Sequence, residues 1–274
     1  MKPISEPLDF YLLIPCYNNK EGLIRSLQSV QYNPGRFGML IVDDGSSTPI
    51  SLQDLVPHLH PDIQIDILTL PGNRGITAAL NAGLQNLLHK PVAPFIARLD
   101  AGDLCTADRF YKQVAFLAAH PDIDLLGSWC IYEDYEKGTK YEYRTPVTHG
   151  MIRKGMYFRN IFVHPSVMWR ASALEKVPAY PDNFPHAEDY GFFYSLMKQG
   201  NVAVIPESLL TKEMSKSSIS LVFRRAQLRS RMKVVRQFGE SKWLVALGVV
   251  KIWLLLAAPY SMVLQAKKLL YTTR

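Results

Sequence analysis

Cysteine is scarce in this chain of 274 residues, which holds only Cys16, Cys105 and Cys130 and no CxxC pair. Three separated cysteines argue against a disulfide framework; they suit packing positions in a reducing compartment. The first eight residues also lack an apolar run of signal-peptide length, since they contain Lys2, Glu6 and two prolines. We therefore expect the catalytic part of the chain to remain in the cytosol.

Acidic residues are scarce in the last part of the chain. Residues 211–274 hold 13 Lys+Arg against 2 Asp+Glu, a net charge of +11, whereas residues 1–210 carry a net charge of −4. This asymmetry indicates an anionic partner for the tail, either a membrane surface or nucleic acid. The length and the 48% content of hydrophobic residues suit one large domain, or a domain with an appendage.

Apolar runs alternate with segments of helical periodicity along the first two-thirds of the chain. The runs predict strands at 10–14, 39–42, 63–70, 94–99, 125–132, 140–144, 162–169 and 202–205. The periodic segments predict helices at 21–30, 75–88, 188–199 and, with Thr106 as its cap, up to residue 119. We expect an α/β, Rossmann-like fold with a mainly parallel central sheet and flanking helices over residues 1–210, followed by a helical tail at 211–274.

Polar motifs follow several of the predicted strands, at the point where each strand ends. In an open α/β sheet, ligands bind beside the carboxyl ends of the strands, so we expect these motifs to converge. The first is the turn Asp43-Asp44-Gly45-Ser46-Ser47. It suits a surface turn, and it also suits an acid that accepts a hydrogen bond from a nucleotide base or ribose.

The segment Arg98-Leu99-Asp100-Ala101-Gly102-Asp103 places two acids three residues apart in one tight loop. A divalent metal takes few carboxylates and completes its shell with water and phosphate oxygens. Asp100 and Asp103 are therefore candidate ligands for Mg²⁺ or Mn²⁺, although an Asp-capped turn explains them about as well. Gly102 lets the chain turn, or lets a ligand approach the backbone.

Three further sites each have a functional and a structural interpretation. Glu188 and Asp189 open a predicted helix, where acids complement the helix dipole; an acid there also suits a general base for an alcohol. Arg74 suits a phosphate contact at a helix N-terminus or a solvated loop. His164 suits a ligand, a donor contact or a buried histidine with a satisfied hydrogen bond, and the last is favoured.

Taken together and in order, the motifs resemble those of the family-2 glycosyltransferases with the GT-A fold, over roughly residues 10–210. Ile14-Pro15-x-Tyr17-Asn18, the turn at 42–46 and Asn73-x-Gly75 look like the nucleotide half of that family. Residues 97–103 look like its metal-binding region, and residues 164–168 with Glu188-Asp189 look like its acceptor half. The resemblance is to members that build bacterial surface polysaccharide and lipopolysaccharide O-antigen.

The resemblance implies an inverting transfer from a nucleoside-diphosphate sugar, most simply a UDP-sugar, to an acceptor hydroxyl. Asp189 is implied as the base; Asp100 and Asp103 are implied as ligands of Mg²⁺ or Mn²⁺, which with Arg74 stabilises the leaving diphosphate. His164 and Glu188 are implied on the acceptor side. The implied donor-binding residues are Pro15, Tyr17, Asn18, Asp43, Asp44, Arg74, Arg98 and Asp100.

The sequence departs from the family pattern in two places. Many relatives carry Asp-Ala-Asp-Asp where this chain has Asp100-Ala101-Gly102-Asp103. The difference leaves open which acid contacts the metal and predicts a weaker dependence on metal. The Gln-x-x-Arg-Trp signature of processive synthases is missing from the tail, which favours the addition of single sugars.

The tail combines a basic and an apolar segment. Basic and apolar residues interleave over 223–238, which predicts an amphipathic helix on an anionic leaflet. Residues 243–264 are mostly apolar but contain Lys251 and Pro259, so interfacial or re-entrant helices are favoured over a membrane span or a helix packed on the protein. We expect residues 220–270 to contact an anionic membrane surface rather than nucleic acid.

These expectations place the protein at the cytoplasmic face of the bacterial inner membrane, as a peripheral or monotopic protein with a polyprenyl-diphosphate-linked or saccharide acceptor. Two other functions stay open. A nucleotidyltransferase that makes the activated sugar usually has a Gly-rich basic loop after its first strand, whereas this loop is Pro15-Cys16-Tyr17-Asn18-Asn19-Lys20. Asp100 and Asp189 argue against a catalytically inactive nucleotide-sugar-binding protein, while Gly102 keeps it open.

Overall fold

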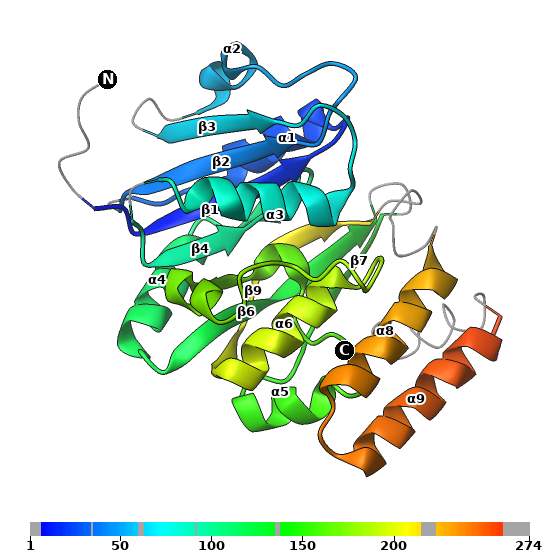
Figure 1. Cartoon of the computed structure of the whole chain (residues 1–274). Helices are drawn as coiled ribbons and strands as arrows, with labels where there is room; N and C mark the ends of the chain where they lie inside the picture. The colour runs from blue at the N-terminus through cyan, green and yellow to red at the C-terminus, as the bar shows by residue number, and fades with distance from the viewer. Residues whose placement is uncertain are drawn as a thin grey trace.

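The computed structural model describes residues 7–33, 35–59, 63–90, 92–134, 138–214 and 223–259. Within these ranges one nine-stranded sheet has the order β3-β2-β1-β4-β8-β6-β9-β5, and β7 pairs with β6 (Figure 1). The strands are β1 (Phe10–Cys16), β2 (Phe37–Asp43), β3 (Gln64–Thr69), β4 (Phe95–Arg98), β5 (Leu104–Cys105), β6 (Ile123–Asp134), β7 (Thr139–Tyr143), β8 (Met168–Arg170) and β9 (Asn201–Glu213).

Helices cover both faces of the sheet, and α3 and α6 lie on the face nearer the viewer in Figure 1. The α-helices are α1 (Lys20–Ser29), α2 (Leu52–Leu55), α3 (Ile76–Leu87), α4 (Arg109–Ala119), α5 (His149–Gly155), α6 (Glu188–Gln199), α8 (Arg224–Phe238) and α9 (Lys242–Ala257). Short 3₁₀ helices occur at η1 (Val56–His58), η2 (His164–Ser166) and η3 (Ala171–Glu175).

The sheet has two halves of different character. Strands β3, β2, β1 and β4 run parallel. Beyond them β8 is antiparallel to both β4 and β6, β9 is parallel to β6, and β5 and β7 add antiparallel pairs. The predicted parallel sheet is thus found in the N-terminal half, while the complete sheet is mixed. The connection between β6 and β7 is short, and only antiparallel strands can be joined in that way.

Side-chain alternation along β1 divides the hydrophobic core between the two faces of the sheet. Phe10, Leu12 and Ile14 belong to the cluster that includes α1 and α4. Tyr11 and Leu13 belong to the opposite cluster, which includes α3, α6 and α8. This alternation with a period of two residues gives both layers of helices an apolar surface to pack on.

Two predicted local features differ in the structure. The predicted strand at 162–169 is wrong over its first part, because residues 164–166 form η2 and only Met168–Arg170 pair as β8. Pro165 has no N–H to give to a strand ladder, which accounts for the late start. Thr106 is not the cap of the next helix: α4 begins at Arg109 after Asp108, and the Thr106 hydroxyl instead donates to Asp108 Oδ1 at 2.8 Å.

Strand β9 extends well past the predicted end at residue 205. Its register against β6 shifts after Ile205, and pairing then resumes and continues to Glu213. The predicted domain boundary at residue 210 therefore falls inside a strand. The last residues of this strand, including Lys212, lie beside the loop that contains Asp100 and Asp103.

The tail helices α8 and α9 lie side by side at one end of the molecule (Figure 1). Leu228, Met232 and Val235 of α8 are buried in the same hydrophobic cluster as α6. Arg225, Arg229, Lys233 and Arg236 of the same helix are exposed, so the predicted amphipathic helix is present.

Helix α9 ends at Ala257, before Pro259, and residues 260–270 of the predicted membrane-binding segment lie outside the described residues. Gly248 and Ile252 are buried against the protein. Trp243, Leu247, Val250, Trp253 and Leu254 are exposed. Over the part of the chain that is described, no helix combines the length and the apolarity needed to cross a membrane.

Candidate active site

The loops that follow β1, β2 and β4 are joined to one another at the carboxyl edge of the parallel strands. The Asn18 N–H donates to Ser46 Oγ at 2.9 Å, and Asn18 Oδ1 accepts the Ser47 N–H at 2.9 Å. Asn19 Nδ2 donates to the Ala101 carbonyl at 2.8 Å. Three of the predicted motifs therefore form one connected surface, as the sheet geometry led us to expect.

The two acids of the β2 turn each bind a pair of backbone N–H groups. Asp43 accepts from Ser46 and Ile50, both at 3.0 Å. Asp44 accepts from the N–H groups of Arg74 and Gly75, both at 2.9 Å. Asp44 therefore holds the loop that presents the exposed Arg74, and the predicted contacts of both acids with a nucleotide remain predictions.

Gly45 allows the loop that contains Gly72 and Arg74 to lie directly against the turn that follows β2. It has φ of +70°, and a Cβ at this position would lie 2.3 Å from the backbone of Gly72. A pocket of about 420 Å³ borders the same turn and is lined by Asn18, Asn19, Lys20, Glu21, Ser46, Ser47, Thr48 and Ile50. Tyr17 is exposed nearby, whereas Pro15 is buried within β1.

Arg98, Asp100, Asp103 and Lys212 form one cluster of alternating charge. The fully buried Arg98 pairs through Nη1 with Asp100 Oδ1 at 2.7 Å. Lys212 Nζ bridges the two acids, at 3.2 Å from Asp100 Oδ2 and 3.1 Å from Asp103 Oδ2. Arg98 Nε and Nη2 have no hydrogen-bond partner among the described residues, although both are buried.

Burial and the neighbouring opposite charges shift the pKa values of this cluster in opposite directions. Burial raises the pKa of Asp103 to about 6, and Lys212 only partly opposes that effect. Burial also opposes ionisation of Asp100, but the charges of Arg98 and Lys212 outweigh it and hold the Asp100 pKa below its usual range. The two acids likewise outweigh burial at Lys212 and raise its pKa, so its ammonium stays charged.

The residues of this cluster do not match the needs of a divalent metal. Mg²⁺ requires near-octahedral oxygen ligands at short distance, and Mn²⁺ also prefers carboxylate and water oxygens. Here an ammonium group lies between the two acids, and Gly102 stands where another acid would add a ligand. Within the described ranges, no group of three or more His, Cys, Asp or Glu side chains is arranged to hold a metal ion.

The predicted base lies within electrostatic reach of this cluster. Asp189, in the first turn of α6, accepts a hydrogen bond from Asn160 Nδ2 at 2.9 Å. Burial raises its pKa, and the negative charge of Asp100 adds to that effect. Burial and the adjacent Asp189 also raise the pKa of Glu188 to about 7, while Glu188 Oε2 has no partner among the described residues.

His164 lies beside the same charges. Its Nε2 is 3.1 Å from the Tyr180 hydroxyl, and its ring packs edge-on against Phe193. Burial, assisted by the positive charge of Arg98, holds the His164 pKa well below its ordinary value. His164 is thus a half-buried, hydrogen-bonded histidine that is neutral at physiological pH, and its role at the acceptor side stays a prediction.

Three residues at the site were not predicted from the sequence. Lys212 was assigned to the tail, although the run Leu209-Leu210-Thr211 after Pro206 is a signal that a strand resumes there. Asn160 and Tyr180 lie in irregular segments, and no pattern in the sequence indicated their contacts with Asp189 and His164.

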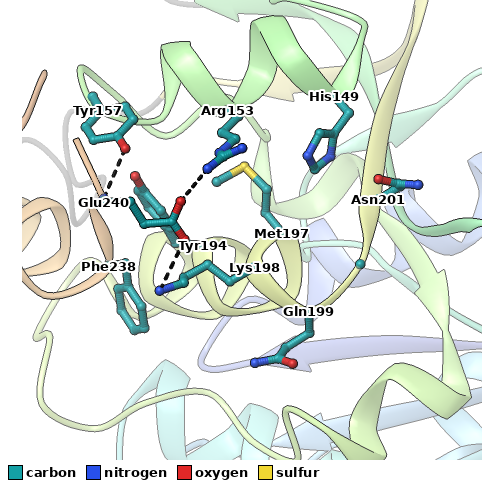
Figure 2. Close-up of a pocket in the computed structure, with 11 residues that line it drawn as sticks. His149, Arg153, Tyr157, Tyr194, Met197, Lys198, Gln199, Asn201, Phe238 and Glu240 are labelled. Carbon is teal, nitrogen blue, oxygen red and sulfur yellow. Dashed lines mark hydrogen bonds and ion pairs between the residues drawn. The ribbon is translucent and has the colours of Figure 1, made fainter.

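A second pocket lies elsewhere, between α5, α6 and the start of the α8–α9 connection. It measures about 340 Å³ and contains none of the predicted site residues. In Figure 2, Arg153 and Lys198 both point toward Glu240, and both pair with it. Because none of the predicted site residues lines it, this pocket is separate from the candidate active site.

Comparison with known proteins identifies the family. The model of "Glycosyl transferase family 2" matches residues 11–177. The chain belongs to glycosyl transferase family 2. It is 30% identical over 205 residues to the amylovoran biosynthesis glycosyltransferase AmsE of Erwinia amylovora, covering 73% of this chain and 74% of AmsE. The resemblance seen in the motifs is thus confirmed.

A relative with a named reaction is the UDP-Gal:alpha-D-GlcNAc-diphosphoundecaprenol beta-1,3-galactosyltransferase of Escherichia coli. The two chains are 26% identical over 194 residues, which cover 70% of this chain and 68% of the relative. Among solved structures, the mannosyltransferase PcManGT from Pyrobaculum calidifontis, in complex with GDP-Man and Mn²⁺, superposes with a TM-score of 0.64. It is 16% identical, and the match covers 97% of this chain and 81% of that one, which supports the GT-A-like fold.

Proposed function

We propose that the protein is an inverting glycosyltransferase that moves one sugar from a UDP-sugar to a hydroxyl of a lipid-linked or saccharide acceptor, in the synthesis of a bacterial surface polysaccharide. One observation carries the proposal: the carboxyl of Asp189, half-buried in the first turn of α6, is close enough to Asp100 for the charge of Asp100 to add to burial in raising its pKa. A candidate base and the candidate donor loop therefore share one site. The UDP-galactose and the diphosphoundecaprenol-linked acceptor of the E. coli relative support the donor and acceptor classes.

In the proposed reaction the acceptor hydroxyl attacks the anomeric carbon while its proton passes to Asp189. The raised pKa of Asp189 makes it a stronger base than a solvated aspartate, and the Asn160 amide holds its carboxylate in place. Attack from the face opposite the diphosphate inverts the anomeric centre. The bond to the leaving diphosphate breaks, and its negative charge is stabilised by cations such as the exposed Arg74.

Glu188 is assigned to the acceptor. Its buried Oε2 lacks a partner among the described residues, and an unpaired buried carboxyl oxygen is costly unless a ligand completes it. A hydroxyl of the acceptor sugar has the donor that this oxygen needs. His164, neutral and held by Tyr180, is likewise assigned to the acceptor side as a positioning residue.

The direct test is an assay with purified protein, a synthetic polyprenyl-diphosphate-linked sugar and a panel of sugar nucleotides. We expect release of the nucleoside diphosphate and a product heavier by one sugar unit, with an anomeric configuration opposite to that of the donor. Formation of a sugar nucleotide from a sugar phosphate and a nucleoside triphosphate would instead favour the nucleotidyltransferase. Binding of donors without any transfer would favour the inactive binding protein.

Membrane association belongs to the same proposal. The exposed basic side chains of α8 suit anionic headgroups, and the exposed apolar side chains of α9 suit the outer acyl region. In co-sedimentation with anionic vesicles, we expect the pair Trp243→Ser and Trp253→Ser to reduce binding. Leu88→Ser, which changes an exposed apolar residue at the end of α3, is the matched control and leaves binding unchanged. Equal binding by all three proteins would contradict this membrane surface.

A further inference from the structure

Lys212 lies between the two acids that were expected to bind a metal. Its Nζ is 3.2 Å from Asp100 Oδ2 and 3.1 Å from Asp103 Oδ2. The other two oxygens are also engaged, because Asp100 Oδ1 pairs with Arg98 and Asp103 Oδ1 accepts the Glu213 N–H. Each carboxylate oxygen of the pair therefore already has a cationic or N–H partner.

The backbone fixes this position of the lysine. Strands β5 and β9 pair so that Leu104, next to Asp103, lies opposite Thr211, next to Lys212. The same pairing aligns the Glu213 N–H with the Asp103 carboxylate. The ammonium group is thus brought to the acids by two short strands, rather than by a flexible surface loop.

Charge balance in the cluster argues against an additional divalent cation. Arg98 and Lys212 together neutralise Asp100 and Asp103. A Mg²⁺ ion at the same acids would have to displace the Lys212 ammonium from their oxygens, or leave two uncompensated positive charges until the diphosphate binds.

Lys212 has one hydrogen-bond donor left for a ligand. An ammonium group has three N–H donors, and Asp100 and Asp103 take two of them. The Lys212 side chain retains 29% of its exposure, whereas Asp103 behind it is buried. One donor is therefore available to a phosphate oxygen that approaches from the open side of the loop.

On the basis of the function proposed above, we propose that the Lys212 ammonium, and not a bound divalent cation, contacts the diphosphate of the donor in this protein and donates a hydrogen bond to one of its phosphate oxygens. Nucleotide binding and sugar transfer then proceed without added metal. The proposal differs from the Mg²⁺ or Mn²⁺ expected from the family resemblance, and Gly102 is the sequence feature that accompanies the difference.

The first experiment compares nucleotide binding with and without metal. UDP, and then GDP, is titrated into the full-length protein by calorimetry in EDTA and again with MnCl₂. We expect the dissociation constants to agree within about twofold, and the rate of diphosphate release in the transfer assay to be the same in both buffers. Binding that appears only with Mn²⁺ would overturn the role of Lys212 while leaving the transferase intact. Failure of both nucleotides to bind in either buffer would overturn the proposed function as well.

The second experiment removes the cation. Lys212→Ala should weaken UDP binding in EDTA by roughly 10- to 100-fold, the usual cost of losing a charge-assisted hydrogen bond. The freed carboxylates should then bind Mn²⁺ in the presence of UDP, seen as loss of the free Mn²⁺ signal in electron paramagnetic resonance. Lys212→Arg should keep metal-free UDP binding, because it keeps the charge.

Lys112→Ala is the matched control, since Lys112 also pairs with two acids, Asp108 and Glu207, but on the surface of α4. We expect it to match the wild type in both UDP and Mn²⁺ binding. Wild-type protein that takes up Mn²⁺ with UDP as strongly as Lys212→Ala would refute the proposal. If Lys212→Ala fails to fold, as judged by circular dichroism, the EDTA comparison on the wild type still decides.

Discussion

The two halves of the sheet use their acids in different ways. In the parallel half, Asp43 and Asp44 each bind two backbone N–H groups and hold the loops of the β2 turn together. In helix α6, which packs against β6 and β9 of the mixed half, Glu188 has a buried oxygen without a partner among the described residues, and burial raises the pKa of both Glu188 and Asp189. The acids of one site therefore have two different roles. Some bind the backbone and hold its loops, and others have a raised pKa that suits them to accept a proton.

The largest expected effect is on catalysis, and it concerns Asp189, one of the two acids with a raised pKa. Asp189→Asn keeps the size of the side chain and its contact with Asn160 but removes the base. We expect kcat to fall by roughly 10²- to 10⁴-fold, the usual contribution of a general base, while UDP binding stays within about twofold. Asp182→Asn, an exposed acid in the segment before α6, is the control and should retain full activity. Unchanged turnover of Asp189→Asn would assign the base elsewhere.

A large effect on stability is expected where the loops of the parallel half touch. Gly45→Ala combines a positive φ with a Cβ only 2.3 Å from the Gly72 backbone. We expect the free energy of unfolding in urea to fall by about 3 kcal/mol. Gly138→Ala also has a positive φ but faces open space, so its cost should be only about 1 kcal/mol. Equal losses would show that the two loops do not lie in contact.

Removal of a carboxylate from the first group should reduce stability rather than chemistry. Asp44→Ala leaves the N–H groups of Arg74 and Gly75 without their partner. We expect a loss of about 2 kcal/mol in the free energy of unfolding, together with weaker UDP binding as the Arg74 loop loosens. Thermal melts and calorimetry check both effects. A fall in kcat with unchanged stability would place Asp44 with the catalytic acids instead.

An effect that vanishes at low pH is expected at Glu188. The Glu188 pKa of about 7 lies above the ordinary value of 4.5, so the folded state holds this proton more tightly than the unfolded state. Glu188 therefore makes the free energy of unfolding fall as pH rises from about 4.5 to about 7. Glu188→Gln should equal the wild type near pH 4 and exceed it by up to about 3 kcal/mol at pH 8. A stability difference that is constant with pH would contradict the raised pKa.

The sequence was sufficient to predict the parallel half. Its strands and helices alternate along the sequence, and polar motifs follow the strands. The rule that ligands gather at the carboxyl ends of such strands predicted that the loops containing Asn18, Ser46 and Ala101 would meet. In the tail, the helical periodicity of residues 224–236 correctly indicated α8, and Pro259 marked the region where α9 ends.

The mixed half was harder to predict because its contacts depend on tertiary structure. Pro206 interrupts the apolar pattern, so the continuation of β9 to Lys212 was not foreseen. The fully buried Arg98 and the unpaired oxygen of Glu188 arise from packing between distant elements, which no local pattern encodes. The predicted strand at 162–169 was wrong for a local reason instead, because Pro165 within it has no N–H to donate to a strand ladder.

The irregularity in β9 sets which side chain faces the two acids. Ser128 lies opposite Ile205, Trp129 opposite Ser208 and Cys130 opposite Leu210, so three residues of β9 are skipped in the ladder. Neighbouring residues of a strand point to opposite faces. The number of skipped residues therefore decides which side chains of the later part of β9 face the two acids. One additional skipped residue would bring Glu213 to the place of Lys212. A site with its own cation would become a set of three acids, the composition from which divalent-metal sites are built.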